Sequence, residues 1–131
     1  MRKVAEAQLR YLGFEVMCAT TGKDAIAIHK REMRKGKRFS LALLDLTLRG
    51  GMSGVQAISA IRKIDPDVVA VVTSGHVDSP VLSSPESYGF NGKIMKPYLM
   101  SDLGRVLRDV LSRNDCISRR NGCVCLDTQQ N

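Results

Sequence analysis

The sequence predicts an α/β fold built on a doubly wound parallel sheet. Short apolar runs alternate with segments of helical periodicity, in the order α-β-α-β-α-β-α-β-α. Two of these runs, Leu41–Asp45 and residues 68–73, are almost continuously apolar, which is typical of strands buried on both faces. Strands that alternate with helices in this way indicate parallel crossover connections.

The composition fits one globular domain. The chain has 131 residues, of which 44% are hydrophobic and 25% charged. No apolar run reaches the ~18 residues of a membrane span, and the N-terminus lacks the apolar stretch of a signal peptide. We therefore expect a cytoplasmic protein without membrane insertion.

The positive charge does not by itself indicate nucleic-acid binding. The net charge is +7, and seven basic residues fall between Lys23 and Arg38. No aromatic residues are interleaved with them, and no RNA-binding signature or helix-turn-helix accompanies them. We interpret this cluster as a solvated helix face and predict no nucleic-acid partner. Three of the four cysteines lie near the C-terminus with the spacing C-x6-C-x-C, which is not the spacing of a zinc site, and all four are interpreted as reduced thiols.

The first half of the chain is predicted to contain two helices and two strands. Gly13 is a natural end for the first helix, and Thr21 with Asp24 forms a capping box at the start of the second. The second helix is expected to bury Ala25, Ile28 and residues 32–33. The elements are a helix at 2–12, a strand at 14–19, a helix from 22 to about 35 and the strand Leu41–Asp45.

The second half repeats the alternation. Ser53 and Gln56 form a second capping box, and Pro66 ends the helix that follows. Pro80 and Pro85 are expected to interrupt an irregular helix, and Ser101 is expected to cap the last one. The strands are residues 68–73 and Gly92–Met95, and the pattern ends near residue 113.

Polar side chains follow three of the predicted strands. Asp45 ends one strand, Thr73 lies at the end of the next, and Lys96 follows the last. Because the carboxyl ends of parallel strands meet at one edge of the sheet, these three side chains are expected to converge. A carboxylate nucleophile with an ammonium and a hydroxyl beside it can receive and hold a phosphoryl group.

These residues lie in motifs that resemble the receiver domains of two-component response regulators. The matching stretches are LLDLTLRGGMSG at 43–54, VVTSGH at 71–76 and YGFNGKIMKPY at 88–98. The resemblance covers residues 2–112 and is strongest to the receivers at the C-termini of hybrid sensor histidine kinases. It implies a flavodoxin-like (CheY-like) fold with the strand order 2-1-3-4-5.

The resemblance also implies a role for each site residue. Asp45 matches the phospho-acceptor, Thr73 the switch hydroxyl, and Lys96 the lysine that pairs with the phosphate. The carbonyl of Thr47, two residues past Asp45, matches a ligand of Mg²⁺, which Asp45 also binds. The partner would be a histidine kinase or phosphotransfer domain. The domain would not be an enzyme, beyond self-catalysed phosphotransfer and autodephosphorylation. It would act either as a single-domain regulator or as the detached end of a hybrid histidine kinase.

Two features depart from the family pattern. Lys93 stands at the position of the switch aromatic, three residues before Lys96. The family's first strand, which ends in an acidic metal-binding pair, has no counterpart, because the sequence starts within the first helix. That strand lies inside the sheet, and an empty slot would cost ~1–3 kcal/mol for each backbone group left without a partner.

Three alternatives remain for this slot. Residues 122–127 of the tail (113–131) are apolar, favour a strand and end in Asp127, which would serve as a replacement metal ligand. Alternatively, another chain supplies the strand in an exchanged homodimer or the sheet rearranges; in the third alternative the tail is disordered and the start of the sequence is truncated. We expect residues 1–112 to form the receiver domain in each case.

Two functions follow from these alternatives. The first is phosphorelay signalling through Asp45 with Mg²⁺. The second is a phosphorylation-deficient interaction module of the same fold, because the acidic pair is absent. A phosphatase using Asp45 as its nucleophile is disfavoured, since Thr47 stands where such enzymes place a second acid.

Overall fold

The computed structural model describes residues 2–13, 15–19, 21–36, 39, 41–46, 52–74, 80–95, 98–113 and 123–127. Within them, helices and strands alternate as the sequence predicts, which confirms the α/β class. The helices are α1 (Arg2–Tyr11), α2 (Gly22–Arg34), α3 (Gly54–Ile64), α4 (Pro80–Ser83), the 3-10 helix η1 (Pro85–Tyr88) and α5 (Met100–Arg113). The strands are β1 (Glu15–Ala19), β2 (Leu41–Asp45), β3 (Ala70–Ser74), β4 (Gly92–Met95) and β5 (Cys123–Asp127).

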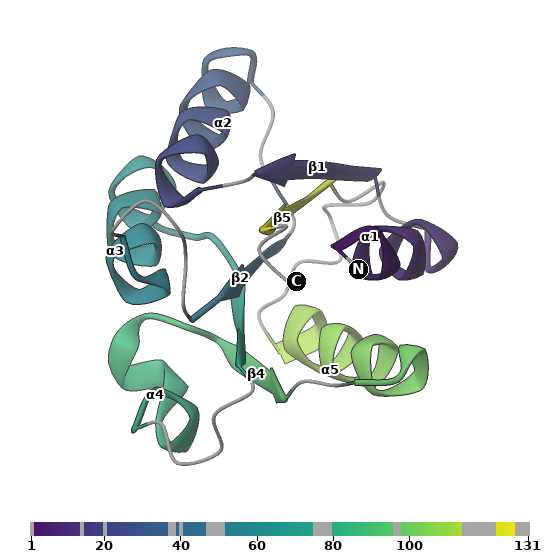
Figure 1. Cartoon of the computed structure of the whole chain (residues 1–131). Helices are drawn as coiled ribbons and strands as arrows, with labels where there is room; N and C mark the ends of the chain where they lie inside the picture. Colours follow the sequence, from purple (N-terminus) through teal and green to yellow (C-terminus); the bar gives the residue numbers. More distant parts are fainter. Residues whose placement is uncertain are drawn as a thin grey trace.

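The strands form one parallel sheet in the order β1-β5-β2-β3-β4. Helices α1 and α5 cover one face, and α2 and α3 cover the other (Figure 1). Each strand therefore divides its side chains between two cores. Leu41 and Leu43 pack with α1 and α5, whereas Ala42 and Leu44 pack with α2, α3 and α4. Burial on both faces explains why the β2 sequence is apolar at successive positions.

Strand β5 lies inside the sheet, between β1 and β2. Its register with β1 runs from Glu15↔Cys123 to Ala19↔Asp127, and with β2 from Leu41↔Val124 to Leu43↔Leu126. If β5 takes the place of the family's first strand, the sheet has the expected 2-1-3-4-5 order. Of the three alternatives for the slot, the structure has the arrangement in which the chain's own tail fills it.

The predicted helix starts are confirmed at α2 and α3. The Thr21 hydroxyl accepts a hydrogen bond from the Asp24 N–H, at 3.1 Å. At α3 both halves of the capping box are present, because the Gln56 N–H donates to the Ser53 hydroxyl at 3.1 Å and the Ser53 N–H donates to the Gln56 side chain at 2.9 Å. These bonds satisfy N–H groups that have no partner within the helix.

Three details of the sequence prediction are wrong. Ser101 does not cap α5 but lies in its first turn, and Asp102 accepts the hydrogen bond from the Leu99 N–H at 3.2 Å. Pro80 and Pro85 begin α4 and η1 rather than interrupt a helix, because proline fits the first helical position, where no N–H partner exists. The strand predicted at 68–73 is observed as Ala70–Ser74.

Helix α2 buries a different residue from the one predicted. His29, rather than Ile28, is buried, and its ring centroid lies 4.5 Å from that of Phe39. The His29 Nδ1 lies 2.9 Å from the Ala25 carbonyl oxygen, so Nδ1 carries a proton and donates to that oxygen. Burial lowers the pKa of His29, partly offset by the bond to Ala25 and by the charge of Asp65.

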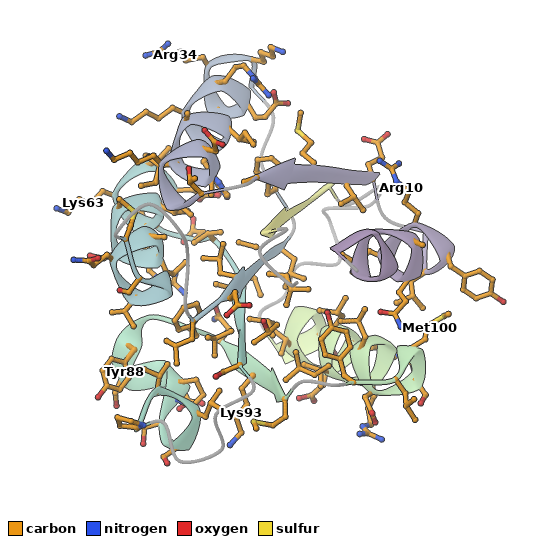
Figure 2. The ribbon with its side chains drawn as sticks, in the orientation of Figure 1. Arg10, Arg34, Lys63, Tyr88, Lys93 and Met100 are labelled. Atoms are coloured by element: carbon orange, nitrogen blue, oxygen red, sulfur yellow. The ribbon has the colours of Figure 1, made fainter. Side chains whose placement is uncertain are left out.

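The basic residues of α2 face solvent. Figure 2 shows Arg34 extending from α2, and Lys63 from α3, away from the sheet. The exposed cations of the cluster within the described residues are Lys23, Lys30, Arg31, Arg34 and Lys35. No helix in the described ranges is long and apolar enough to cross a membrane.

Candidate functional site

Asp45 is the last residue of β2 and is 6% exposed. Its register partner on the neighbouring strand is Thr73 of β3. The Leu46 N–H continues the ladder beyond Asp45, donating to the Thr73 carbonyl oxygen at 2.9 Å. The predicted convergence of the carboxylate and the hydroxyl at one edge of the sheet is thus present in the backbone pairing.

The Thr73 hydroxyl is buried and makes no hydrogen bond to a described residue. Thr73 is 0% exposed, and its Oγ1 has no hydrogen-bond partner among the described residues. A buried hydroxyl without a partner costs ~1–3 kcal/mol. A group with several oxygens, bound at the carboxyl edge of the sheet, would accept a hydrogen bond from this hydroxyl and remove the cost.

Gly54 fixes the turn that follows Asp45. Its N–H donates to the Leu46 carbonyl oxygen at 2.9 Å. A Cβ at this position would lie 2.5 Å from the Asp45 carbonyl oxygen and 3.1 Å from the Leu46 Cα. Only glycine therefore allows α3 to begin this close to the end of β2. The contact positions the backbone of Asp45.

Tyr98 is a neighbour of Asp45 that the sequence prediction did not single out. It is partly buried and packs against the core formed with α1 and α5. Burial raises the pKa of the Tyr98 hydroxyl, and the negative charge of Asp45 raises it further. The phenol therefore stays protonated and able to donate near the site. Its position two residues after Lys96 was the available signal.

Lys93, which stands at the position of the family's switch aromatic, connects β4 to α4. Its ammonium donates to the Leu82 carbonyl oxygen at 2.7 Å, and Figure 2 shows the side chain beside α4. The position that carries an aromatic ring in the family therefore carries a hydrogen bond to a backbone carbonyl here.

Arg62 joins α3 to the segment before β4. Its Nε donates to the Gly89 carbonyl oxygen at 2.8 Å, and its NH2 group donates to the Asn91 Oδ1 at 2.9 Å. The same Oδ1 accepts the Ala70 N–H at 2.8 Å, at the start of β3. This three-part contact lies at the amino ends of β3 and β4, the edge of the sheet opposite to Asp45 and Thr73. No local pattern in the sequence predicts it.

The other predicted site residues are placed only in part. Lys96, Pro97 and Thr47 lie outside the described residues. Asp127 ends β5 at a described backbone position, level with Ala19 of β1. Among the described side chains, no group of three or more His, Cys, Asp or Glu could hold a metal ion.

The oxygen chemistry of the site still suits Mg²⁺. This ion commonly binds one or two carboxylates and completes its coordination with water and phosphate oxygens, so it does not require a cluster of three side chains. Asp45 supplies one buried carboxylate, and the partnerless Thr73 hydroxyl lies on the adjacent strand. The residues present therefore fit the ion that the fold family implies.

Comparison with known proteins identifies the family. The sequence model of one protein family, the response regulator receiver domain, matches residues 1–108 of this chain. Ethylene receptor 2 of Oryza sativa subsp. japonica is 34% identical over 118 residues, which cover 86% of this chain and 15% of that protein. A probable transcriptional regulator ycf27 of Porphyridium aerugineum is 28% identical over 121 residues, covering 92% of this chain and 48% of that protein. The chain thus spans half or less of the length of these relatives.

Solved structures share the fold. A response regulator receiver domain protein from Clostridium thermocellum superposes with a TM-score of 0.74 at 19% identity, covering 88% of each chain. The receiver domain of sensor histidine kinase PA1611 from Pseudomonas aeruginosa PAO1, solved with a magnesium ion in its active-site cleft, gives a TM-score of 0.72 at 24% identity, covering 85% of this chain and 88% of that one. With its CheY-like parallel sheet and with Asp45 beside Thr73 at the sheet edge, this chain belongs to the response regulator receiver domain family of two-component signalling.

Proposed function

We propose that this domain receives a phosphoryl group on Asp45 from a histidine kinase or a phosphotransfer domain and signals by a change in conformation. The observation that carries the proposal is the pairing of Asp45 with Thr73. The two residues are register partners at the carboxyl edge of the sheet, and the buried Thr73 hydroxyl has no hydrogen-bond partner in the described part of the chain.

The transfer step uses the Asp45 carboxylate as the nucleophile. A carboxylate oxygen attacks the phosphorus of a phosphohistidine, an O–P bond forms as the N–P bond breaks, and the electron pair returns to the imidazole nitrogen, which then takes a proton from solvent. Because Asp45 is buried, water has limited access to the acyl phosphate, and its hydrolysis is slowed.

Two further residues are proposed to hold the transferred group. The Thr73 hydroxyl gains in the phosphorylated state the hydrogen-bond acceptor that it lacks in this structure. Lys96, which follows β4, is proposed to supply the ammonium that balances the added negative charge. Tyr98 contributes a protonated phenol near the same carboxylate.

The proposed metal ligands are Asp45, the Thr47 carbonyl and Asp127. Held by these ligands, Mg²⁺ would supply positive charge beside the phosphoryl oxygens. The protein's own contribution is to position Asp45. Gly54 packs closely against the Asp45 carbonyl oxygen, and Asp45 is the last residue of β2.

The similarity to the PA1611 receiver supports the finer proposal that the natural context is the receiver of a sensor histidine kinase. Under this proposal residues 1–112 act as a phospho-acceptor rather than an enzyme, limited to self-catalysed phosphotransfer and autodephosphorylation. The similarity to full-length relatives supports only the receiver part, because the chain spans 48% of one and 15% of another.

Labelling by a small phosphodonor tests the proposal. Acetyl phosphate with Mg²⁺ is expected to add one phosphoryl group to the wild-type chain, as read by intact mass, and Asp45→Asn is expected to remove the label. Asp67→Asn, which changes an exposed acid after α3, is the matched control and should keep it. Unchanged labelling of the Asp45→Asn variant would refute Asp45 as the acceptor.

The alternative function is a protein-interaction module of the same fold. The described side chains contain no cluster of three or more potential metal ligands. A receiver that holds metal too weakly would act as a phosphorylation-deficient interaction module. Absence of any effect of millimolar Mg²⁺ on amide resonances near Asp45, together with absence of labelling, would select this function over phosphorelay.

A further inference from the structure

The end of α2 carries a group of exposed cations on one side of the helix. They are Lys30, Arg31, Arg34 and Lys35. Their spacing forms two neighbouring pairs, because residues four apart in the sequence are adjacent on a helix surface. Figure 2 shows Arg34 extending away from the sheet. We call these four residues the α2 cation cluster.

A buried acid orients two of these cations. The Glu32 side chain is 8% exposed, and its Oε2 lies 3.4 Å from the Arg31 Nε and 3.6 Å from the Lys35 Nζ. The Arg31 and Lys35 side chains themselves remain 56% and 58% exposed, so their other N–H groups face solvent. The shared carboxylate therefore fixes two cations on the surface without covering them.

The stability of α2 does not account for a cluster of this size. A cation in the last turn interacts favourably with the helix dipole, and Arg31 or Arg34 alone would meet that role. Like charges four residues apart, such as Lys30 and Arg34, destabilise a helix. The other acid of α2, Asp24, lies in the first turn, at the opposite end. The end of α2 thus presents more positive charge than the helix needs.

The cluster lies toward the edge of the sheet opposite the phospho-acceptor. Helix α2 follows the carboxyl end of β1 at Ala19 and ends at Arg34, before the amino end of β2 at Leu41. Asp45 is the last residue of β2, at its carboxyl end. A partner bound at the cluster therefore leaves Asp45 accessible to a phosphodonor.

We propose that the α2 cation cluster binds an acidic segment of a partner protein. The argument is charge complementarity, because the planar guanidinium groups of Arg31 and Arg34 match carboxylate groups in shape as well as in charge. Residues 22–35 expose no aromatic or large apolar side chain that could stack on bases or enter a lipid bilayer. This favours a protein over a single-stranded nucleic acid or a membrane. The interaction does not depend on phosphoryl transfer to Asp45.

Binding of a fluorescent polyglutamate peptide to the full chain, measured by anisotropy at about 0.15 M salt, tests the proposal. The double variant Lys30→Gln, Arg34→Gln is expected to weaken binding about tenfold. Both residues are exposed and neither takes part in the ion pairs of Glu32, so this variant should keep the stability of the wild type.

The double variant Arg105→Gln, Arg108→Gln is the matched control. It removes the same two charges from exposed positions of α5, which covers the other face of the sheet (Figure 1). Binding should weaken less than about twofold, because exposed charges separated by more than ~8 Å are largely screened at this salt concentration.

Three results would overturn the proposal. Equal weakening by the two double variants would show that net charge attracts the peptide without a defined surface. Absence of binding to the wild type would exclude an acidic protein segment as the partner. Tighter binding of duplex DNA or of phosphatidylserine vesicles, lost in the Lys30→Gln, Arg34→Gln variant, would assign the cluster to a different class of partner.

This test is independent of the proposed function. Asp45→Asn should bind polyglutamate as tightly as the wild type, because Asp45 lies toward the opposite edge of the sheet. The Lys30→Gln, Arg34→Gln variant should still be labelled by acetyl phosphate. Loss of labelling in a variant that remains folded would contradict the separation of the two surfaces.

Discussion

Asp45 at the end of β2 is the register partner of Thr73 on β3, and the Thr73 hydroxyl beside it is fully buried without a hydrogen-bond partner among the described residues. Stability alone would favour an apolar residue of the same shape at Thr73, since a buried hydroxyl without a partner is costly. The pairing is understandable if the hydroxyl acquires its acceptor only when Asp45 carries a phosphoryl group.

Thr73→Val should therefore separate stability from function. Valine keeps the shape and removes the partnerless hydroxyl, so the free energy of unfolding should stay equal or rise by about 1 kcal/mol. Phosphodonor labelling of Asp45 should become slower or shorter-lived, and Thr73→Ser should restore it. Urea unfolding and the time course of labelling measure the two effects. A clear loss of stability in Thr73→Val would indicate that the hydroxyl already has a structural partner.

Gly54→Ala should damage both the fold and the site. The added Cβ would meet the Asp45 carbonyl oxygen at 2.5 Å, and the backbone on both sides must shift to relieve it. We expect a loss of about 1–3 kcal/mol in the free energy of unfolding and reduced labelling of Asp45.

Gly104→Ala is the matched control for this change. A Cβ at Gly104 in α5 would meet only the Leu12 side chain, at an ordinary distance of 3.6 Å. Because alanine is the better helix former, stability should be unchanged or rise by up to ~1 kcal/mol, and labelling should be unaffected. Equal effects of the two substitutions in thermal unfolding would contradict the role given to Gly54.

His29 should make stability depend on pH. Burial lowers its pKa in the folded state below the ordinary value of 6.5, so below that pH the unfolded chain binds the proton more readily. The stabilisation is fully present above pH 6.5 and is lost as the pH falls toward the folded-state pKa. Urea unfolding between about pH 8 and about pH 5 should show this loss for the wild type and a smaller one for His29→Leu. Identical slopes for both chains would exclude His29 as the cause.

Tyr98 should report the charge of Asp45. Burial is the main cause of its raised pKa, and the Asp45 carboxylate adds to it. Removing that charge in Asp45→Asn should therefore lower the pKa of Tyr98 without returning it to the ordinary value near 10. Ultraviolet titration of the phenols in the wild type and in Asp45→Asn measures the shift. An unchanged Tyr98 titration would show that the two groups do not interact.

The sequence was sufficient for the elements whose signals are local. The apolar run before Asp45 and the capping residues Thr21 and Ser53 predicted β2 and the starts of α2 and α3, and the structure confirms them. The pairing of Asp45 with Thr73 also followed, because parallel strands present their carboxyl ends at one edge. Where two cap-forming residues are adjacent, as at Ser101 and Asp102, local chemistry does not decide which one serves, and the prediction failed.

Features that depend on tertiary packing could not be predicted. An apolar segment such as Cys123–Asp127 favours a strand but does not specify its neighbours, so its place between β1 and β2 remained one of three alternatives. The contact of Arg62 with Asn91 joins residues far apart in the chain. The interaction of Tyr98 with Asp45 likewise joins residues far apart in the chain, and its signal in the sequence was the position of Tyr98 two residues after Lys96.

Trapping of the phosphorylated residue tests the central claim most directly. Borohydride reduces an aspartyl phosphate to homoserine, so peptide mass spectrometry after treatment with acetyl phosphate and Mg²⁺ identifies the acceptor. Our account predicts homoserine at position 45 and at no other aspartate. Homoserine at another aspartate such as Asp65, or none at all in a folded chain with Mg²⁺ present, would contradict it.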